Sequence, residues 1–237
     1  KVNHGIVIAG AQGIGKDTAL APLRMGVGEH NTAEVEPDAI TSQYNGYVKS
    51  VLLVINEVRP HDEDHKASSF YNQLKPLLAS PPEMLPMELK YANVIYIRNL
   101  CHVVLTTNDP LTMYIPSEDR RLFVMTSPLP DPKKTPIFAP DYFTKIHDYL
   151  SAGGSHAVIR WLLNRPLSGF NPCLPPPATA GKKAIIDSAH QVRRTFADDI
   201  YEYFVQKLFP EKPPEVLFTR DLFDFVNASD LFDVRTA

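Results

Sequence analysis

Four short apolar runs in the first 130 residues have the pattern of strands in a buried parallel sheet. They are the runs Gly5–Ala9, 51–58, 101–109 and 121–127. Short runs that are rich in β-branched residues and end in glycine or polar residues are typical of strands covered on both faces. Ligands of open α/β sheets bind at the carboxyl ends of the strands, so the polar residues that follow these runs are candidate site residues.

The pattern between and after these runs predicts helices and one hairpin. Residues 17–26 predict a helix directly after a glycine-rich loop, and residues 65–79 also have helical spacing. Residues 88–99 alternate like a pair of hairpin strands. Farther along, the pattern predicts helices over 140–166 with a Gly-Gly break, a loop over 171–183, one long amphipathic helix or two over 183–209, and a small winged unit over 215–232.

The composition allows one α/β domain with an appendage and excludes a broad basic surface. The chain has 237 residues, of which 44% are hydrophobic, and its formal net charge is −3. A contact with nucleic acid must therefore come from a local patch or from a ring of subunits around a strand.

Cysteine usage and the length of the apolar runs bear on the compartment. Cys101 and Cys173 form neither a disulfide framework nor a metal-ligand spacing, which favours a reducing, cytoplasmic setting. No signal peptide and no apolar run of membrane-spanning length is visible, so we expect no membrane contact. The chain opens almost directly on its first strand, and we therefore expect an upstream segment in a longer protein.

The stretch GAQGIGKDT closely matches a phosphate-binding loop. Gly10, Gly15 and Lys16 fit the pattern G-x-x-x-x-G-K-[ST], but Asp17 stands where Ser or Thr is expected. A strand before the loop and a helix after it would aim backbone N–H groups at phosphates, and Lys16 would reach the β- and γ-phosphates. The alternative is a glycine-rich turn with a surface lysine. The residues expected to bind nucleotide are Gly10, Ala11, Gln12, Gly13, Ile14, Gly15, Lys16, Asp17 and Thr18.

The run VLLVINE ends in Asn56 and Glu57, where such ATPases need acidic residues. Glu57 can activate the attacking water, whereas Asn56 is neutral and a poorer partner for Mg²⁺. The alternative is a core strand with a polar end. Because Mg²⁺ prefers oxygen ligands with one or two carboxylates, we hypothesise that Asp17 supplies the metal-side charge that Asn56 lacks. Thr18 is the second candidate for the hydroxyl ligand, although it points elsewhere on the helix.

Two further motifs follow in the chain. VVLTTND places Asn108 at a strand end, where an amide can orient the attacking water, although an Asn-Asp-Pro turn is the alternative. SEDRRLFV places Arg120 and Arg121 where one of them could stabilise transition-state charge on the γ-phosphate of a neighbouring subunit. The alternative for both arginines is a solvated turn or a surface ion pair.

In this order, the motifs GAQGIGKDT, VLLVINE, VVLTTND and DRRLFV resemble the A, B, C and arginine motifs of superfamily 3 helicases. These are AAA+-related, ring-forming, ATP-driven motors of viruses, phages and mobile elements. More narrowly, the chain is similar to the helicase part of phage and prophage primase–helicases, a likeness that continues into residues 162–189. It covers most of residues 1–190 and departs from the family pattern at Asp17 and Asn56.

The motifs and the resemblance together predict an α/β fold with a P-loop NTPase (AAA+-like) core over residues 1–130. A mainly helical C-terminal region over 131–237 follows and ends in a small winged-helix-like unit. The predicted function is an ATP-dependent DNA helicase motor that uses ATP and Mg²⁺ and works as a ring, expected to be a hexamer. The resemblance also implies 3′→5′ movement on single-stranded DNA and a primase domain upstream.

In that family, a lysine on a hairpin between motifs B and C touches single-stranded DNA in the central channel. Lys90 matches this lysine best, neighbouring Tyr91 could stack on a base, and Arg98 is a weaker candidate. The alternative for Lys90 is a lysine on an exposed hairpin without a DNA role.

Other conspicuous residues are interpreted as structural. The sequence HDEDH over 61–65 predicts a solvated loop, and Trp161 is expected in the core. The pairs Lys182-Lys183 and Arg193-Arg194 are interpreted as surface charge on a helix. Two other functions stay open, namely another P-loop ATPase such as a packaging or loader AAA+ protein, and a nucleotide-binding scaffold without turnover.

Overall fold

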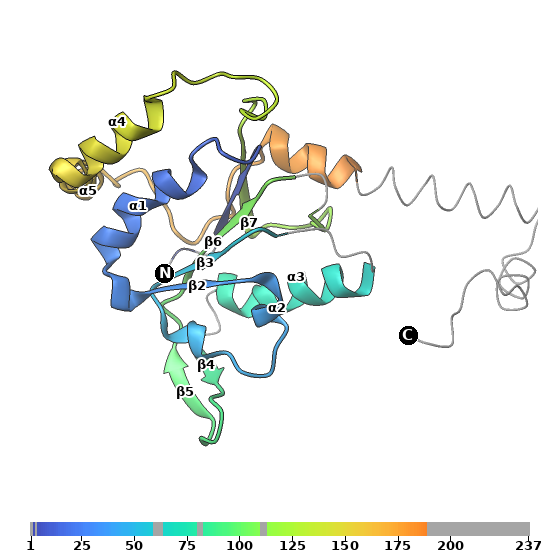
Figure 1. Ribbon diagram of the computed structural model, residues 1–237. Helices are drawn as coiled ribbons and strands as arrows, with labels where there is room; N and C mark the ends of the chain where they lie inside the picture. Colours follow the sequence, from blue (N-terminus) through green and yellow to red (C-terminus); the bar gives the residue numbers. More distant parts are fainter. Residues whose placement is uncertain (1, 3, 59–63, 80–82, 110–112, 189–237) are drawn as a thin grey trace, which may run out of the picture. The chain divides into compact units, whose positions relative to one another are not determined.

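The structure is a computed structural model that describes residues 2, 4–58, 64–79, 83–109 and 113–188 (Figure 1). The chain divides into two compact units, Lys1–Ile186 and Asp187–Ala237. All the elements named below belong to the first unit, apart from the last two residues of a helix over 180–188, so the candidate site can be described within it.

A five-stranded parallel sheet forms the centre of this unit. Its strands are β1 (Gly5–Ala9), β2 (Thr32–Val35), β3 (Leu52–Ile55), β6 (His102–Thr107) and β7 (Leu122–Thr126), in the order β2-β3-β6-β1-β7. All four predicted strands are confirmed. β2 was not predicted, because its sequence TAEV is short and its residues are only partly buried or exposed. The chain is thus a mixed α/β protein with a mostly parallel sheet, and the carboxyl ends of the five strands share one edge.

Different helices cover the two faces of the sheet, and they pack on it through apolar side chains. On one face, Leu20 of α1 (Lys16–Val27) packs with Leu52, Val54 and Val104. On the other face, α3 (Asp64–Leu78) and α2 (Pro37–Ile40) contribute to a larger cluster around Leu53. Figure 1 shows the sheet between α1 and α3. The predicted helices after the loop and over 65–79 are therefore confirmed, and short 3₁₀ turns at Glu29–Asn31 and Gly46–Lys49 complete this half.

A separate two-stranded hairpin joins β4 (Met84–Met87) to β5 (Ile95–Arg98). The hairpin expected over 88–99 is present, but its first strand lies before residue 88 and residues 88–94 form the connection. Leu85 and Met87 are buried in the core, so the alternation of exposed and buried residues in the first strand begins at Met84, before the predicted range. Figure 1 shows the hairpin extending away from the main sheet.

The C-terminal half of the first unit is helical where prediction placed helices. α4 (Tyr142–Tyr149) and α5 (Ser155–Leu163) are separated by Leu150–Gly154, where Gly153 has φ 103°. The predicted Gly-Gly break is thereby confirmed. Residues 180–188 are also helical, so this helix begins inside the stretch 171–183 that was expected to be a loop.

The expectation that Trp161 lies in the core is wrong. Its residue is 58% exposed, and the Arg165 guanidinium carbon lies 4.9 Å from the centroid of its ring. α5 instead packs on α1 through Ile159, which lies so close to Gly26 that a Cβ there would be 3.1 Å from Ile159 Cγ1. The spacing of the apolar residues on α5 did not tell which side of the helix would find a partner.

Some predictions lie outside the described residues. They are the loop character of 61–63, the Arg193-Arg194 pair, the amphipathic helix beyond residue 188 and the winged unit over 215–232. Asp64 and His65, the last two residues of the predicted solvated loop, begin α3 instead. Among the helices that the structure describes, none has the length and apolarity needed to cross a membrane.

Candidate functional site

The glycine-rich loop leaves the carboxyl end of β1 and leads into α1, as the sequence predicts. Gly13 has φ 80° and Gly15 has φ 91°, a region that side-chain-bearing residues rarely adopt. α1 begins at Lys16, so the free N–H groups of its first turn lie beside the loop. Phosphates are bound by this arrangement of loop and helix N-terminus in many proteins.

A pocket of about 490 Å³ opens over the loop. Nine of the residues predicted to act on nucleotide, metal or water line it together, although they come from three distant segments. Its lining residues are Gln12, Gly13, Gly15, Lys16, Asp17, Thr18, Glu36, Asn56, Glu57, Thr106, Asn108 and Phe143. Gly10, Ala11 and Ile14 do not line the pocket, but the first two contact Lys16. The predicted loop, acidic strand end and Asn strand end thus form one site.

The Lys16 ammonium joins the loop to the end of β6. It donates hydrogen bonds to the carbonyl oxygens of Gly10, at 2.6 Å, and Ala11, at 3.0 Å, and to Asn108 Oδ1 at 2.7 Å. Partial burial lowers the pKa of Lys16, and the charges of Asp17 and Glu57 oppose this shift. The ammonium therefore sits among acceptors that an anionic phosphate can replace.

Glu57 follows β3 in a strained backbone conformation. Its φ is 49°, in the left-handed region that few non-glycine residues occupy. The backbone on either side of Glu57 is tied to β6, since Glu57 N donates to Thr106 Oγ1 at 3.4 Å and Val58 N donates to the Thr106 carbonyl at 2.9 Å. Such strain is found at functional sites when the surroundings hold it in place.

Asn56 and Asp17 are connected by a chain of polar contacts that the sequence did not reveal. Asn56 Nδ2 donates to Glu34 Oε2 at 3.4 Å, and Glu34 pairs with Arg24 at 2.8 Å. The same guanidinium lies 3.9 Å from Asp17, whose side chain is 76% exposed. Asn56 Oδ1 is buried and has no hydrogen-bond partner among the described residues.

These residues fit a Mg²⁺ ion only together with a nucleotide. Within the described parts of the chain, no group of three or more His, Cys, Asp or Glu side chains could hold a metal alone. Mg²⁺ usually keeps several waters and takes one or two carboxylates plus phosphate oxygens. Asp17 and Glu57 offer the carboxylates, and the orphaned Asn56 Oδ1 is an oxygen of the kind that Mg²⁺ accepts.

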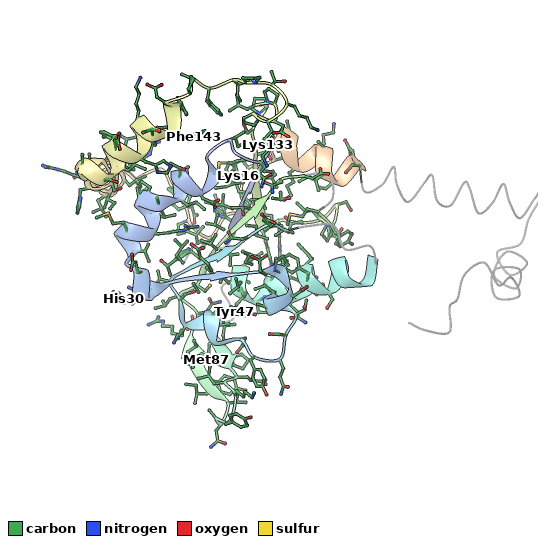
Figure 2. All side chains as sticks on the ribbon, in the orientation of Figure 1. Lys16, His30, Tyr47, Met87, Lys133 and Phe143 are labelled. Atoms are coloured by element: carbon green, nitrogen blue, oxygen red, sulfur yellow. The ribbon has the colours of Figure 1, made fainter. Side chains whose placement is uncertain are left out.

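Three pocket residues were missed by sequence reasoning. Glu36 follows β2, the strand that was not predicted, and Thr106 is a buried residue inside β6. Phe143 belongs to α4, and a Cβ on Gly15 would lie 2.9 Å from its Cε1. Figure 2 labels Lys16, Phe143 and Lys133, whose ammonium donates to Gln12 Oε1 at 2.8 Å. Of these three residues, only Glu36 has a recognisable position in the sequence, because it is an acidic residue directly after the short run TAEV.

Arg120 and Arg121 do not join the pocket of their own chain. They precede β7, and β7 pairs with β1 from Gly5↔Leu122 to Ala9↔Thr126. Both arginines therefore lie at the edge of the sheet where the strands begin, whereas the loop lies at the edge where they end.

Lys90 and Tyr91 lie in the connection at the end of the β4–β5 hairpin. Tyr91 has φ 61° and is 95% exposed, and Lys90 Nζ lies 5.1 Å from the centroid of its ring. The structure therefore presents both predicted DNA-contacting side chains to solvent on a projecting element.

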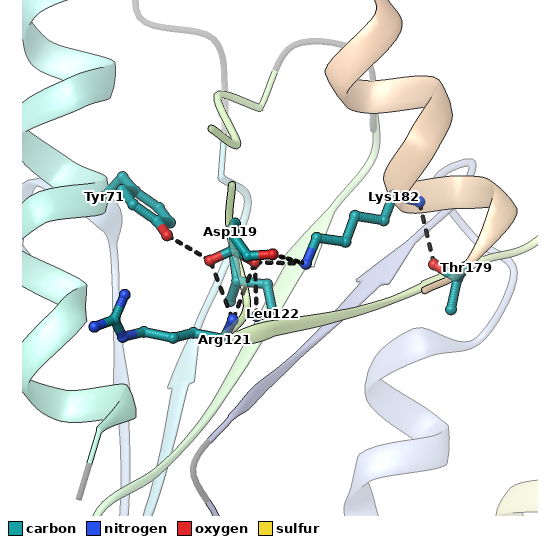
Figure 3. A network of polar contacts seen from close by, with 6 residues as sticks. All are labelled: Tyr71, Asp119, Arg121, Leu122, Thr179 and Lys182. Atoms are coloured by element: carbon teal, nitrogen blue, oxygen red, sulfur yellow. Dashed lines mark hydrogen bonds and ion pairs between the residues drawn. The ribbon is translucent and has the colours of Figure 1, made fainter. Parts of the chain in front are cut away.

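A buried polar network surrounds Asp119, next to the two arginines (Figure 3). The Asp119 carboxylate accepts hydrogen bonds from the Tyr71 hydroxyl and from the backbone N–H groups of Arg121, at 3.2 Å, and Leu122, at 3.0 Å. Lys182 Nζ lies 2.7 Å from Asp119 Oδ2 and donates to the Asp119 carbonyl at 2.7 Å. The interpretation of Lys182 as surface charge is wrong, because the residue is only 8% exposed. Lys183, its neighbour, is exposed as expected.

The network shifts the pKa values of Asp119 and Tyr71, which share a hydrogen bond. Burial alone would raise the pKa of Asp119, but hydrogen bonds from Lys182, Tyr71 and Leu122 together with the Lys182 charge hold it below its usual value. Burial and the contact with Asp119 raise the pKa of Tyr71, and nearby Arg121 opposes this rise. Asp119 is therefore a carboxylate and Tyr71 a neutral donor at neutral pH.

Comparisons with known proteins connect the chain to phage replication proteins. The family model described as "Family of unknown function (DUF5906)" matches residues 8–121. A curated relative, the DNA primase-polymerase of Nitratiruptor phage NrS-1, is 28% identical over 122 residues, which are 50% of this chain and 16% of the relative.

Two solved structures have a similar fold. The apo structure of the NrS-1 C-terminal region (305–718) matches with a TM-score of 0.65 and 18% identity, over 95% of this chain and 53% of that one. The A form apo structure of the same region matches with a TM-score of 0.61 and 19% identity, over 86% and 48%. The chain thus spans about half the length of the structures that it resembles, and its matched segment is a smaller share of the curated relative.

Proposed function

We propose that this chain is the ATP-hydrolysing DNA helicase motor of a phage-type replication protein. The observation that carries the proposal is the single pocket that unites Lys16, Glu57 and Asn108 from three separate strand ends. The similarity to a phage primase-polymerase supports a role in phage DNA replication and the expectation of a primase domain elsewhere in the protein. Ring assembly, as a hexamer, and a cytoplasmic location remain part of the proposal.

Each pocket residue has a role that follows from its position. The Lys16 ammonium would exchange its contacts with the Gly10 and Ala11 carbonyls for the β- and γ-phosphates of ATP. Glu57 would accept the proton of the attacking water. Asn108, which already holds Lys16 at 2.7 Å, would orient that water against the γ-phosphate.

Mg²⁺, when bound with ATP, would neutralise charge that develops on the phosphates. Asp17 and Glu57 would face the ion through their carboxylates, with Asn56 Oδ1 as a neutral oxygen. Thr18 also lines the pocket and remains the second candidate for a hydroxyl ligand. We retain the hypothesis that Asp17 supplies the metal-side charge that Asn56 lacks.

ATPase measurements on the purified chain, with and without single-stranded DNA, test the proposal. The wild-type chain should hydrolyse ATP only with Mg²⁺, and Glu57→Gln should lower kcat by roughly 10²–10⁴-fold because the general base is lost. Lys16→Ala should weaken nucleotide binding as well. Lys183→Ala is the matched control, since this lysine is exposed on the helix over 180–188 and outside the pocket.

A nucleotide-binding scaffold without turnover is the alternative that the departures at Asp17 and Asn56 favour. A chain that binds ATP through Lys16 but shows no hydrolysis above the Glu57→Gln level, with or without DNA, would establish this alternative and contradict the motor.

A further inference from the structure

The segment that leads from β7 into α4 folds back over the phosphate loop. Lys133 Nζ in this segment donates a hydrogen bond to Gln12 Oε1 at 2.8 Å. Farther along, a Cβ on Gly15 would lie only 2.9 Å from Phe143 Cε1. Figure 2 labels Phe143 and Lys133 near Lys16. One side of the pocket is therefore bordered by residues outside the four sequence motifs.

Three aromatic side chains of this segment form a cluster beside the pocket. The Phe138 and Tyr142 rings are stacked, with centroids 4.6 Å apart and an angle of 18° between their planes. Phe143 meets both rings edge to face, at centroid distances of 5.0 and 5.1 Å. Such pairs have preferred geometries, so the two neighbours fix the orientation of the Phe143 ring. Phe143 is the member of the cluster that lines the pocket.

Core packing does not account for this cluster. Tyr142 is 41% exposed, and Phe138 and Phe143 are partly exposed. Neither of the two core clusters found among the described residues includes any of the three rings. Ligand pockets are lined mainly by hydrophobic and aromatic side chains, so exposed rings at the border of a pocket fit a ligand contact.

The strand order tells which end of a nucleotide would meet Phe143. In the order β2-β3-β6-β1-β7, the phosphate loop follows β1. Glu57 and Asn108 come after β3 and β6 on one side of β1, whereas Phe143 comes after β7 on the other side. The proposed site places the γ-phosphate at Glu57 and Asn108. The nucleoside end of the same molecule is then directed toward Phe143.

The pocket lining offers the base a ring rather than groups that read its edge. Apart from the loop and α1, its polar lining residues lie in or after β2, β3 and β6, on the phosphate side, namely Glu36, Asn56, Glu57, Thr106 and Asn108. Gln12 Oε1 is already bonded to Lys133. A pocket that contacts a ligand through apolar surface discriminates weakly between ligands of similar shape, whereas a pocket with dedicated hydrogen bonds discriminates strongly.

We propose that Phe143 is the platform on which the base of the bound nucleotide stacks, and that the pocket takes purine nucleotides without reading the edge of the base. Phe138 and Tyr142 are positioning residues that orient the platform. The substrate class is thus purine nucleoside triphosphates, with ATP and GTP both accepted. The inference rests on the proposed nucleotide site, and it holds whether or not the bound nucleotide is hydrolysed.

The first test separates the base from the phosphates. Calorimetric titrations with Mg²⁺ compare ADP with inorganic tripolyphosphate, which has no base. Phe143→Ala should weaken ADP binding by roughly 5–150-fold, the loss expected for one stacked base, and leave tripolyphosphate binding unchanged. Phe143→Tyr should keep the ADP affinity. Phe143→Leu, which retains apolar bulk without a ring face, should bind ADP as weakly as Phe143→Ala.

The outcomes distinguish this inference from the proposed function. Trp161→Ala is the matched control, because this exposed aromatic residue lies on α5 and outside the pocket. Wild-type ADP affinity in Phe143→Leu overturns the platform alone. Equal losses for ADP and tripolyphosphate in Phe143→Ala also overturn it, since they indicate damage to the phosphate loop. A wild-type chain that binds neither probe overturns the proposed function and this inference together.

The second test addresses the supporting rings. Phe138→Ala should weaken ADP binding, although less than Phe143→Ala does, and should leave tripolyphosphate binding unchanged. This split between the two probes is not expected of a residue that only stabilises the fold. A Phe138→Ala chain that loses melting temperature but keeps its ADP affinity contradicts the positioning role.

The third test compares bases on the wild-type chain. ADP and GDP should bind with affinities within about 10-fold of each other, because apolar contact distinguishes them weakly. CDP should bind more weakly than both, because its single ring buries less apolar area on Phe143. A larger difference between ADP and GDP shows that the base edge is read, and CDP binding as tight as that of ADP removes the purine preference; either result overturns the proposed substrate class.

Discussion

At the residue scale, this chain departs from the usual phosphate-loop pattern at Asp17, which stands where Ser or Thr is expected. Asp17 has a carboxylate and Asn56, which directly follows β3, has a neutral amide, and both side chains line the same pocket. Arg24 and Glu34 connect them, since Arg24 lies 3.9 Å from Asp17 and Glu34 accepts from Asn56. The hypothesis that Asp17 supplies the carboxylate that Asn56 lacks rests on this chain of contacts.

This hypothesis predicts that the two positions compensate each other. Asp17→Ser should lower Mg²⁺-dependent ATPase activity by roughly 10–100-fold through weaker metal binding, because one carboxylate is lost. Asn56→Asp in the Asp17→Ser background should restore much of it by returning an acid to the other side. Titration of the ATPase rate with Mg²⁺ measures both effects. Equal activities of Asp17→Ser and the double variant would show that the positions are not coupled.

At the element scale, the β4–β5 hairpin has one end buried in the core and the other end exposed. Leu85 and Met87 anchor it in the core, while Tyr91 is 95% exposed at its connection. A cationic side chain beside an exposed aromatic ring is the combination that binds single strands without sequence preference. The hairpin is therefore the element on which the proposed DNA contact depends.

Substitutions at the end of the hairpin should separate DNA contact from ATP hydrolysis. Lys90→Ala and Tyr91→Ala should each weaken binding of single-stranded DNA, and loss of a stacked base costs about 1–3 kcal/mol. Basal ATPase activity should persist, while unwinding is lost in Lys90→Ala. Lys145→Ala is the control, because this exposed lysine belongs to α4, which Figure 1 shows far from the hairpin. Unwinding that survives Lys90→Ala would contradict the proposed role of this hairpin in contacting the DNA strand.

At the scale of the whole described unit, Asp119 and Lys182 join parts of the chain that are distant in sequence. Tyr71 belongs to α3, Asp119 precedes β7, and Lys182 belongs to the helix over 180–188 (Figure 3). Because the pKa of Asp119 is lowered in the folded state, its stabilising contribution is complete above the unfolded value of about 4. The contribution is lost as the pH falls through the lower folded value.

Acid should therefore erase the difference between the wild-type chain and Asp119→Asn. At neutral pH the variant should unfold more easily by roughly 3 kcal/mol, since Lys182 is left as a buried charge without its partner. As the pH falls below about 4, the wild-type carboxylate becomes protonated and the difference should shrink. Denaturant unfolding at several pH values measures it. A constant difference across this range would show that the charge of Asp119 does not contribute.

Local patterns in the sequence were sufficient to predict most of the helices and strands and the central residues of the candidate site. Four strands, α1, α3 and the broken helix pair follow from runs of apolar residues, because burial and period are local properties. The loop, Glu57 and Asn108 were also found, since the carboxyl ends of parallel strands must share one edge. β2 escaped because a run of four partly buried residues carries almost no periodic signal.

Only the tertiary structure decided which side chains meet across long stretches of sequence. Phe143 contacts Gly15 because α4 lies beside the loop. Lys182 is buried because its ammonium pairs with the Asp119 carboxylate. Trp161 is exposed for the converse reason, as α5 turns Ile159 toward α1. The sequence by itself thus determined the elements and the chemistry at their ends. Burial, charge pairing and the different exposure of Arg120 and Arg121 depend on contacts that no local pattern encodes.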